Sequence, residues 1–302
     1  MKKKILVLGG SGFLGSNLCS FFVNREYEVY SYDRSFSSKL EKVHFIEGDF
    51  FDDVKLEAAV RGMDCIIHAI STVNPGNSNE FYMHGYSREL LQTIKLCNML
   101  VGEQTSMIFL SSGGTVYGDH QKQPIDETVL PRPINHYGNI KLCIENTMRT
   151  FNYQMGTRFI IARISNPYGP GQDFHKGVGF IDAVLKNTMQ GIPIEIWGDG
   201  DNVRDYVYID DVCEMIECLV RYCGDQETFN ISSGRGYTQN AVIGMLWGMG
   251  LSPKVIYKER RRVDVRKIIL SNAKIACLWK GEPIGLAEGM ELYYQYLKER
   301  NV

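Results

Sequence analysis

Ile5-Leu6-Val7-Leu8-Gly9-Gly10-Ser11-Gly12-Phe13-Leu14-Gly15 is the stretch on which our fold prediction depends. Its apolar run is typical of a buried strand, and it leads into a glycine-rich turn and a helix-like segment. Gly9 suits a turn that needs a positive φ, Gly12 allows backbone to approach a pyrophosphate, and Gly15 allows helix and strand to pack closely. The sequence therefore predicts a strand, a phosphate-binding turn and a helix.

The second apolar run, Tyr27-Glu28-Val29-Tyr30-Ser31-Tyr32, ends at Asp33. A carboxylate at about this separation from the glycines binds the 2′-hydroxyl of an adenosine ribose. Its charge repels a 2′-phosphate, so Asp33 favours NAD over NADP, although the neighbouring Arg34 weakens this preference. We therefore expect the turn to bind a dinucleotide, with NAD as the cofactor.

Composition excludes several classes of function. The 302 residues allow one large or two modest domains, and the formal charge of −2 provides no basic field for nucleic acid. The eight cysteines form no paired CxxC arrangement, and Cys213, Cys218 and Cys223 have no nearby His, which favours buried thiols over a zinc site. The first apolar run is too short for a signal peptide or a membrane span, so we expect a reduced, cytoplasmic protein.

Strands and helices alternate after Asp33. Residues 43–49 are expected to form a third strand, whose terminal Asp49 either faces adenine or is a solvated turn residue. A helix over 52–60 leads to a buried strand within 62–71, where we interpret His68 as a packed structural histidine. Residues 80–100 are expected to form one long helix with an apolar stripe facing the core. The stripe consists of Leu90, Leu91, Ile94 and Cys97.

A hydroxyl-rich strand exit and a helix supply the candidate chemistry. The strand over 107–110 opens into residues 111–118, which are rich in hydroxyls and glycines. Tyr137 and Lys141 lie four residues apart at the start of a helix that runs to about Met155, so they share one helical face. A phenol of pKa about 10 is a poor base at neutral pH, but an ammonium and a nicotinamide cation both stabilise the phenolate. This pair is our candidate for catalysis.

With these residues in place, the chain resembles the extended short-chain dehydrogenase/reductases, particularly their nucleotide-sugar epimerase/dehydratase branch of UDP-glucose 4-epimerase-like enzymes. The resemblance covers nearly the whole chain. It rests on GGSGFLG (9–15), GD (48–49), HAIS (68–71), SSGGTVYG (111–118), YGNIK (137–141), RISNPYGPGQ (163–172), GDGDNVRDYVYIDDV (198–212) and FNISSG (229–234).

The resemblance implies an α/β fold with a doubly wound parallel (Rossmann) sheet and a smaller α/β carboxyl-terminal substrate lobe. We expect the NAD-binding domain to span 1–166, with returning segments near 206–232, and the nucleotide-sugar-binding lobe to span 167–302. The implied reaction is NAD-dependent C4 epimerisation of a UDP-sugar through a transient 4-keto intermediate. UDP-glucose, UDP-galactose and their N-acetyl forms are the expected substrates. No metal ion is expected in the site.

The resemblance also implies residue roles. Tyr137 and Lys141 are implied to be catalytic, and Ser112 and Thr115 are candidates for relaying the proton or polarising the sugar 4-oxygen. The expected cofactor contacts are Gly9, Gly12, Phe13, Leu14, Gly15, Asp33, Arg34, Asp49, Phe50, Ala69, Ile70, Ser71, Ser111, Tyr137 and Lys141. The expected substrate contacts are Asn166, Gly177, Val178, Ile196, Trp197, Arg204, Arg261 and Asp264.

The arginines have two interpretations. A guanidinium such as that of Arg261 can bind phosphate bidentately, as the resemblance implies. Without the resemblance, Arg260 to Arg262 would pass as a solvated face, and Arg204-Asp205 as a structural ion pair.

Three positions in the segment 111–118 depart from the family pattern. In relatives, the hydroxyl that assists the tyrosine stands three positions before the Val of the VYG motif, which is Gly113 here. Ser112 or Thr115 must then take this role, or the proton follows another route. Dehydratases carry an Asp-Glu pair at the positions of Gly114 and Thr115, so its absence argues against dehydration.

Two other functions remain open. The protein could be a nucleotide-sugar oxidoreductase or 4-keto reductase that exchanges NAD(H) in each turnover. It could also be a non-catalytic NAD-binding sensor, which Gly113 supports and the Tyr137/Lys141 pair opposes. We expect a homodimer formed through the helices near 80–100 and 135–155, whose apolar stripes could instead pack inside one subunit.

Overall fold

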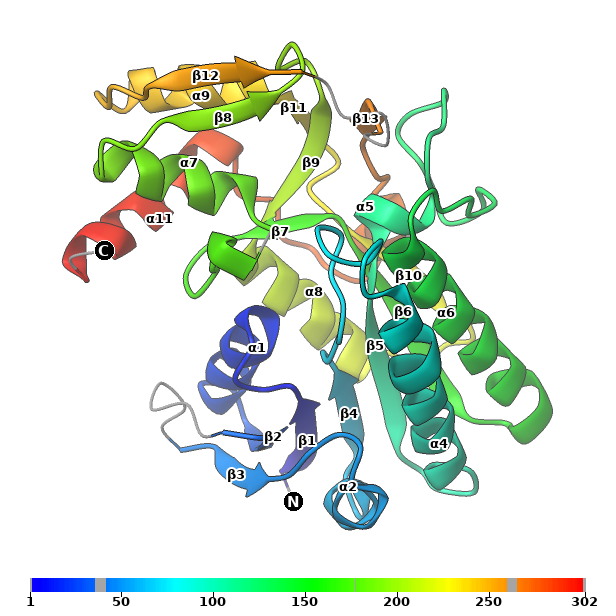
Figure 1. The fold of residues 1–302 in the computed structure, drawn as a ribbon. Helices are drawn as coiled ribbons and strands as arrows, with labels where there is room; N and C mark the ends of the chain where they lie inside the picture. Colours follow the sequence, from blue (N-terminus) through cyan, green and yellow to red (C-terminus); the bar gives the residue numbers. More distant parts are fainter. Residues whose placement is uncertain (1, 36–41, 177, 260–264, 301–302) are drawn as a thin grey trace.

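A large parallel sheet organises the fold. The structure, a computed structural model, describes residues 2–35, 42–176, 178–259 and 265–300 (Figure 1). Seven strands pair in parallel in the order β10-β6-β5-β4-β1-β2-β3. They are β1 (Lys3–Leu8), β2 (Tyr27–Asp33), β3 (His44–Glu47), β4 (Cys65–His68), β5 (Ser106–Ser112), β6 (Arg158–Ile164) and β10 (Thr228–Ile231). The strand order reverses between β1 and β4, and doubly wound sheets bind ligands at the carboxyl ends of strands beside such a point.

Helices cover both faces of this sheet, which explains why its strands are short apolar runs. On one face lie α1 (Phe13–Val23) and α8 (Ile209–Arg221), and on the other lie α2 (Asp53–Val60), α4 (Leu91–Met99) and α6 (His136–Met155) (Figure 1). Alternate residues of β1 point to opposite faces, as strand geometry requires. Ile5 and Val7 pack in the core beside α1 and α8, whereas Leu6 and Leu8 pack beside α2, α4 and α6.

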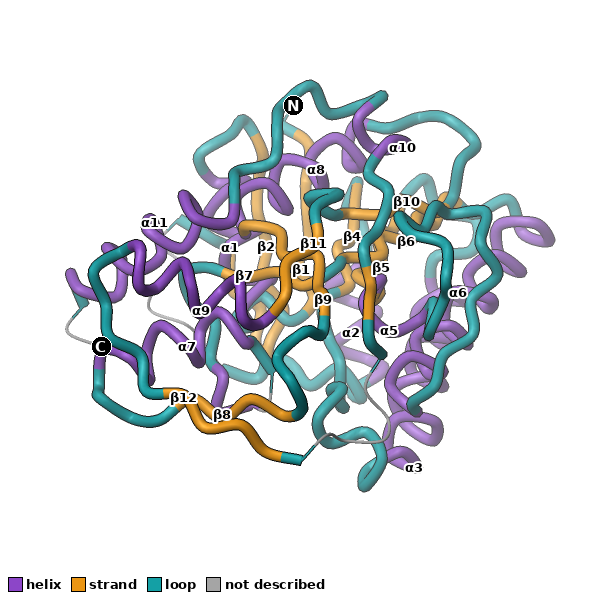
Figure 2. The backbone as a smooth tube through the Cα atoms, turned by 90° about the horizontal axis from the view of Figure 1, so that it is seen from above, coloured by secondary structure: helices purple, strands orange, loops and turns teal. Residues whose placement is uncertain are grey.

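A smaller lobe follows in the second half of the chain. One of its sheets has the order β11-β9-β13, with β7 also paired to β9, and β8 pairs with β12 in a second sheet. Figure 2 shows β8 and β12 side by side, apart from the strands of the large sheet. The strands are β7 (Asn166–Tyr168), β8 (Ile194–Trp197), β9 (Val203–Tyr208), β11 (Gly236–Thr238), β12 (Val255–Lys258) and β13 (Lys267–Ile268). The remaining helices here are η2 (Phe174–Lys176), α7 (Phe180–Met189), α9 (Gln239–Gly248), α10 (Ala273–Ala276) and α11 (Leu286–Glu299).

One hydrophobic core joins the sheet to the lobe. The cluster that contains Ile5 of β1 continues through Ile216 of α8 to Val184 of α7 and Met290 of α11. β10 lies at one edge of the large sheet, beside β6. The predicted fold, a doubly wound parallel sheet with a smaller lobe, is confirmed, and the division of the chain at 166/167 stays a prediction.

The segment 80–100 differs from the single α-helix that we expected. It consists of α3 (Tyr82–His84), the π-helical turn η1 (Gly85–Leu90) and α4. A π turn holds more residues than an α turn, so the buried face is not the one that regular helical spacing predicts. The predicted stripe is therefore wrong in part. Leu91 is 54% exposed, and Glu89 and Thr93 are buried instead.

Close packing of helices accompanies the π turn. A Cβ at Gly85 would lie 2.3 Å from Cδ1 of Ile140 on α6, so the absence of a side chain lets η1 approach α6. Within the described ranges, every helix is too short or too polar to cross a bilayer.

Candidate active site

The turn after β1 has the geometry of a phosphate cradle. Gly9 has a φ of 83°, which favours glycine, and a Cβ at Gly15 would lie 2.1 Å from the carbonyl oxygen of Gly9. Gly12 precedes α1, and no side chain of the described residues caps the first turn of this helix. The first amides of a helix and its dipole attract anions. These residues therefore fit the pyrophosphate of a dinucleotide.

Asp33 lies beside this turn, at the carboxyl end of β2. Its Oδ2 accepts a hydrogen bond from the Ser11 amide at 3.0 Å, and its Oδ1 accepts one from the Arg34 amide at 2.7 Å. The Ser11 hydroxyl donates to the carbonyl of Ser35 at 2.8 Å. These bonds fix the carboxylate beside the glycines, and the Arg34 side chain is exposed. The arrangement supports the predicted ribose contact, which stays a prediction.

The exits of β4 and β3 complete the surroundings of the turn. The Ala69 amide donates to the carbonyl of Leu8 at 3.0 Å, and a Cβ at Gly9 would lie 3.0 Å from Cγ1 of Ile70. Asp49 is exposed, and its Oδ1 accepts from the Phe51 amide at 2.9 Å. This bond fits the turn interpretation of Asp49, and its predicted contact with adenine stays untested. Phe50 is buried, whereas Phe13 and Leu14 are partly exposed on α1.

Helix α6 holds Tyr137 and Lys141 together. Oδ1 of Asn135 caps the helix by accepting from the Gly138 amide at 2.8 Å, and Gly156 ends it with a φ of 66°. The i, i+4 spacing places Nζ of Lys141 5.6 Å from the centre of the Tyr137 ring. Nζ also lies 4.7 Å from the centre of the Phe109 ring on β5, so the ammonium sits at the sheet.

Charge and burial act against each other at this pair. Burial raises the pKa of Tyr137, and the charge of Glu89 raises it further. The Lys141 charge and a hydrogen bond with the Ser112 side chain lower this pKa, but the net direction is upward. Burial lowers the pKa of Lys141, but the negative charges of Glu89 and of an ionised Tyr137 outweigh burial, so the net direction is again upward. Lys141 is therefore an ammonium at neutral pH, beside a phenol that holds its proton until further positive charge is near.

The hydroxyls at the end of β5 and in the following helix do not all point to the pair. Ser111 donates its hydroxyl to Oε1 of Glu145 at 2.6 Å, inside the core. Ser112 precedes the short helix α5 (Gly113–Val116), and its side chain lowers the pKa of the Tyr137 phenol. The Thr115 hydroxyl donates to the Ser112 carbonyl at 3.5 Å. Of the two candidates for relaying a proton, Ser112 therefore has the closer relationship with Tyr137.

Packing explains the glycine at 113. A Cβ there would lie 2.3 Å from Cδ1 of Leu270 and 3.0 Å from the carbonyl oxygen of Arg163. A serine hydroxyl at this position therefore has no room unless Leu270 moves.

The candidate substrate residues lie in the lobe. Nδ2 of Asn166 donates to the Asp205 carbonyl at 3.1 Å, and Nη1 of Arg204 donates to the Val203 carbonyl at 2.9 Å. β7 and β9 pair in parallel, which brings the segments of Asn166 and Arg204 together. Within β8 the Ile196 side chain is fully buried and Trp197 is partly exposed. Val178 is exposed before α7, and Gly177, Arg261 and Asp264 lie outside the described residues.

The Asp205 carboxylate links three segments. It is buried and accepts hydrogen bonds from the amides of Ser233, Gly234 and Leu270, at 3.0, 3.2 and 3.1 Å. These bonds connect β9 with the segments that follow β10 and β13. Burial raises the pKa of Asp205 to about 6, because the hydrogen bonds that favour its ionised form offset only part of the cost of burial.

The arrangement matches one family of known proteins. The model of the NAD dependent epimerase/dehydratase family matches residues 5–232, most of the chain. The chain belongs to this family. Its membership confirms the resemblance and the prediction of a NAD-dependent protein.

Solved structures agree with this family membership. The UDP-glucose 4-epimerase of Thermotoga maritima, solved with UDP-glucose, is 31% identical, with a TM-score of 0.91 over 99% of this chain and 100% of that chain. The UDP-glucose 4-epimerase of Thermus thermophilus, solved in complex with NAD, is 26% identical, with a TM-score of 0.90 over 98% of this chain and 99% of that one.

A reductase is also similar in sequence: the dTDP-4-dehydro-6-deoxyglucose reductase of Escherichia coli is 30% identical over 80% of each chain.

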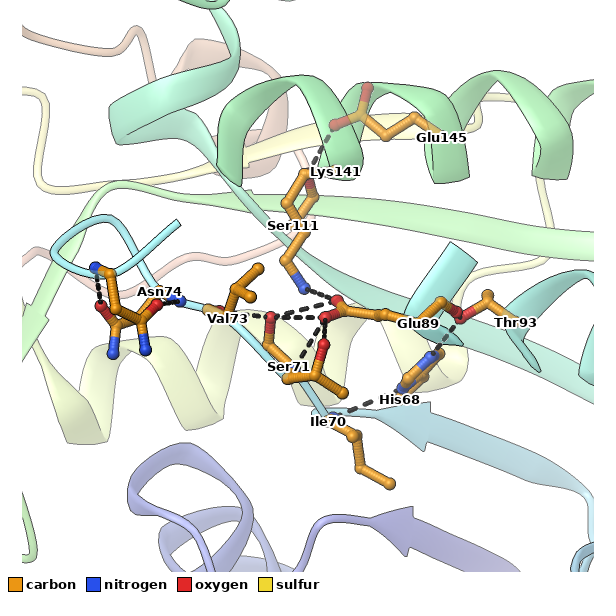
Figure 3. Close-up of polar contacts among 12 residues, drawn as sticks. His68, Ile70, Ser71, Val73, Asn74, Glu89, Thr93, Ser111, Lys141 and Glu145 are labelled. Atoms are coloured by element: carbon orange, nitrogen blue, oxygen red, sulfur yellow. Dashed lines mark hydrogen bonds and ion pairs between the residues drawn. The ribbon is translucent and has the colours of Figure 1, made fainter. Parts of the chain in front are cut away.

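Sequence reasoning missed one charged residue of this candidate site. Oε1 of Glu89, on η1, lies 3.2 Å from Nζ of Lys141, and the Glu89 side chain is fully buried (Figure 3). Glu89 falls beside the expected apolar stripe of a helix, where a glutamate usually reads as a solvated residue. The sequence signal that could have indicated a buried Glu89 was its position beside the expected apolar stripe, one turn before Thr93.

Proposed function

We propose that the protein catalyses the NAD-dependent C4 epimerisation of a UDP-sugar, either UDP-glucose/UDP-galactose or their N-acetyl forms. One observation carries the proposal: the Lys141 ammonium is held 5.6 Å from the centre of the Tyr137 ring. The pair lies at the same end of the large sheet as the glycine turn. A cation fixed beside a phenol favours phenolate, and a phenolate can remove the proton of a sugar hydroxyl.

The residues of the chain have distinct roles in this proposal. Tyr137 takes the proton of the sugar 4-hydroxyl and returns it later, and Ser112 hydrogen-bonds with Tyr137 and relays the proton or polarises the 4-oxygen. Lys141 lowers the pKa of Tyr137 and donates to the nicotinamide ribose, and Thr115 is the second candidate for the relay. Bound NAD supplies the acceptor and donor of the hydride at C4. Because hydride is returned in each cycle, the protein should retain its NAD.

The lobe would hold the nucleotide part of the substrate. We assign this role to Asn166, Val178, Ile196, Trp197 and Arg204, and to Gly177, Arg261 and Asp264 among the residues that the structure does not describe. The Ile196 side chain is buried, so a nucleotide would reach its backbone. A guanidinium supports binding of a diphosphate because its planar N–H groups match two oxygens at once.

Similarity over nearly the full length of two UDP-glucose 4-epimerases supports epimerisation, and the similarity to a reductase over 80% supports the alternative of an oxidoreductase. The deciding experiment incubates the purified protein with each of the four UDP-sugars, without added cofactor, and separates the products. Interconversion without net change in the absorbance of reduced nicotinamide is expected. A stoichiometric change in that absorbance would favour the oxidoreductase, and no conversion of any nucleotide-sugar would favour a sensor.

Exposed apolar side chains support a homodimer through the two long helical segments. They are Phe81, Met83 and Leu91 before and on α4, and Tyr153 and Met155 on α6. Burying such side chains stabilises an interface in proportion to the apolar area removed from water. Sedimentation of the wild type should give a dimer and that of Leu91→Arg a monomer. A monomeric wild type would exclude this proposal.

A further inference from the structure

The Glu89 carboxylate is a buried anion that contacts the candidate catalytic lysine. Its Oε1 accepts from Nζ of Lys141 at 3.2 Å and from the Ser71 hydroxyl at 3.0 Å. Its Oε2 accepts from the Thr72 amide at 2.6 Å and the Thr72 hydroxyl at 2.9 Å. Figure 3 shows the side chains of Ser71 and Lys141 converging on Glu89.

Burying this ion pair is costly for the fold. Removing a carboxylate and an ammonium from water costs several kcal/mol each, so a buried pair is weak evidence for stability alone. The hydrogen bonds from Ser71 and Thr72 supply the additional partners that a buried carboxylate needs. Glu89 thereby connects the β4 exit, where the cofactor is expected, with the lysine on α6.

The backbone holds Glu89 in this place by an irregular device. The π turn η1 directs Glu89 toward α6, and Gly85 lets the two helices approach closely. Thr93 donates its hydroxyl to the Glu89 carbonyl at 2.8 Å, one turn later. π turns occur often at functional sites because they change which side chains face a cleft.

We propose that Glu89 is a positioning residue that fixes Lys141 beside Tyr137 and sets the pH at which this pair loses its first proton. Its consequence for turnover rests on the function proposed above. Its consequence for the titration of the pair rests on the geometry alone.

The sign follows from electrostatics. A nearby negative charge disfavours every deprotonated form of the Tyr137–Lys141 pair, whichever of the two groups loses its proton first. Glu89 therefore keeps Lys141 charged and also opposes the effect of Lys141 on the phenol. The positive charge that stabilises the Tyr137 phenolate is then not supplied by Lys141 alone.

Other titratable groups around the pair have partners of their own. On β4, His68 is neutral because burial, and then the Lys141 charge, lower its pKa to about 3. On α6, Glu145 binds Arg163 at 2.6 Å, and Nδ1 of His136 lies 3.3 Å from the Tyr86 hydroxyl of η1. Glu89 is therefore the carboxylate whose removal should change the titration most directly.

The test is a titration of the full chain without cofactor or sugar. Tyrosine labelled at 13Cζ and lysine labelled at 13Cε report both groups by NMR, and the Tyr137→Phe and Lys141→Met spectra assign the signals. In Glu89→Gln the first deprotonation of the pair should become at least about tenfold more favourable, at correspondingly lower pH. An unchanged titration in a folded Glu89→Gln protein would overturn the proposal.

Two further variants keep the test decisive. Glu89→Asp replaces Glu89→Gln if the latter does not fold. It withdraws the carboxylate by one methylene, so the first deprotonation of the pair should shift in the same direction by a smaller amount. The control is Asp182→Asn in the lobe, which removes a buried carboxylate that pairs with Lys186 at 2.8 Å. It should lower stability and leave the pair's titration unchanged. An equal shift in this control would assign the effect to general loosening and reject the proposal.

Turnover gives a separate readout. If the protein is an epimerase, the acidic limb of its kcat–pH profile should move to lower pH in Glu89→Gln, with little change in KM for the sugar. Absence of epimerisation in the wild type would reject the proposed function and leave the titration result intact. Epimerisation with an unshifted titration would reject only the role of Glu89.

Discussion

Nζ of Lys141 lies 5.6 Å from the centre of the Tyr137 ring, one turn further along α6. Both residues are fixed by the capped start of this helix and by its packing on β5. The relationship joins a local helical spacing to the sheet edge at which the β1 turn and the β4 exit also lie.

The Tyr137→Phe variant should separate catalysis from cofactor binding. Loss of the hydroxyl removes the group that we propose exchanges a proton with the sugar, so turnover should fall by at least about a hundredfold. NAD affinity, measured by calorimetry, should stay close to that of the wild type because the ring remains. Undiminished turnover would remove Tyr137 from the catalytic role.

The Asp33→Asn variant should change cofactor preference. It keeps the shape of the side chain and removes the charge that repels a 2′-phosphate, so NADP should gain affinity relative to NAD. NAD itself should bind about tenfold more weakly, the value of one charged hydrogen bond. Asp49→Asn is the matched control, and titration calorimetry with both dinucleotides measures the outcome. If only Asp49→Asn weakened NAD, the adenosine contact would belong to Asp49.

The Gly113→Ser variant tests whether the missing hydroxyl limits the protein. The new Cβ would collide with Cδ1 of Leu270, and overpacking of this kind costs about 1–3 kcal/mol of unfolding free energy. We expect denaturant unfolding to show that loss, with no gain in turnover. Gly114→Ser is the control, since its Cβ would have 3.5 Å of room to Ser165. A faster and equally stable Gly113→Ser protein would show that this hydroxyl is what the chain lacks.

His68 should make the fold sensitive to acid. Nδ1 accepts from the Ile70 amide at 3.4 Å, Nε2 lies 3.1 Å from the Thr93 hydroxyl, and burial followed by the Lys141 charge lowers the pKa of His68 from 6.5 to about 3. The unfolded chain therefore binds this proton first. The stabilising contribution of His68 is fully present above pH 6.5 and is lost as the pH falls toward 3. At about pH 4.5 this loss amounts to about 3 kcal/mol of unfolding free energy.

A comparison of two proteins isolates this contribution. Asp205, with a pKa raised to about 6, acts in the opposite direction, because its protonation favours the fold as the pH falls. Unfolding free energies of the wild type and of His68→Gln, measured across the same pH range, should differ in slope below about pH 6.5. His68→Gln should be less stable at neutral pH but lose less stability in acid. Parallel curves would mean that His68 is not held neutral.

Local patterns explain what could be predicted from the sequence. The glycine turn, the carboxylate that ends β2 and the pair on α6 each depend on spacing within one element or two adjacent ones. The strand predicted over 43–49 is confined to His44–Glu47, and that over 107–110 extends to Ser106–Ser112, because pairing with neighbouring strands sets the ends. Such boundaries depend on contacts far away in the sequence.

Glu89 shows why the rest could not be predicted. Its partners Thr72 and Lys141 lie 17 residues before it and 52 residues after it, and no regular period connects them. The π turn that directs it inward also invalidates the helical spacing from which we chose the apolar stripe. The lack of space at Gly113 depends on Leu270, which is equally remote in sequence.

The core that runs from Ile5 to Met290 has a thermodynamic consequence. Two lobes that share apolar side chains lose much of their buried surface when either one unfolds, so neither is a separate cooperative unit. Calorimetry should give one melting transition whose calorimetric and van't Hoff enthalpies agree. The candidate cofactor region and the candidate substrate lobe would then gain or lose stability together, and a ligand that tightens one should protect amides of the other from exchange with solvent.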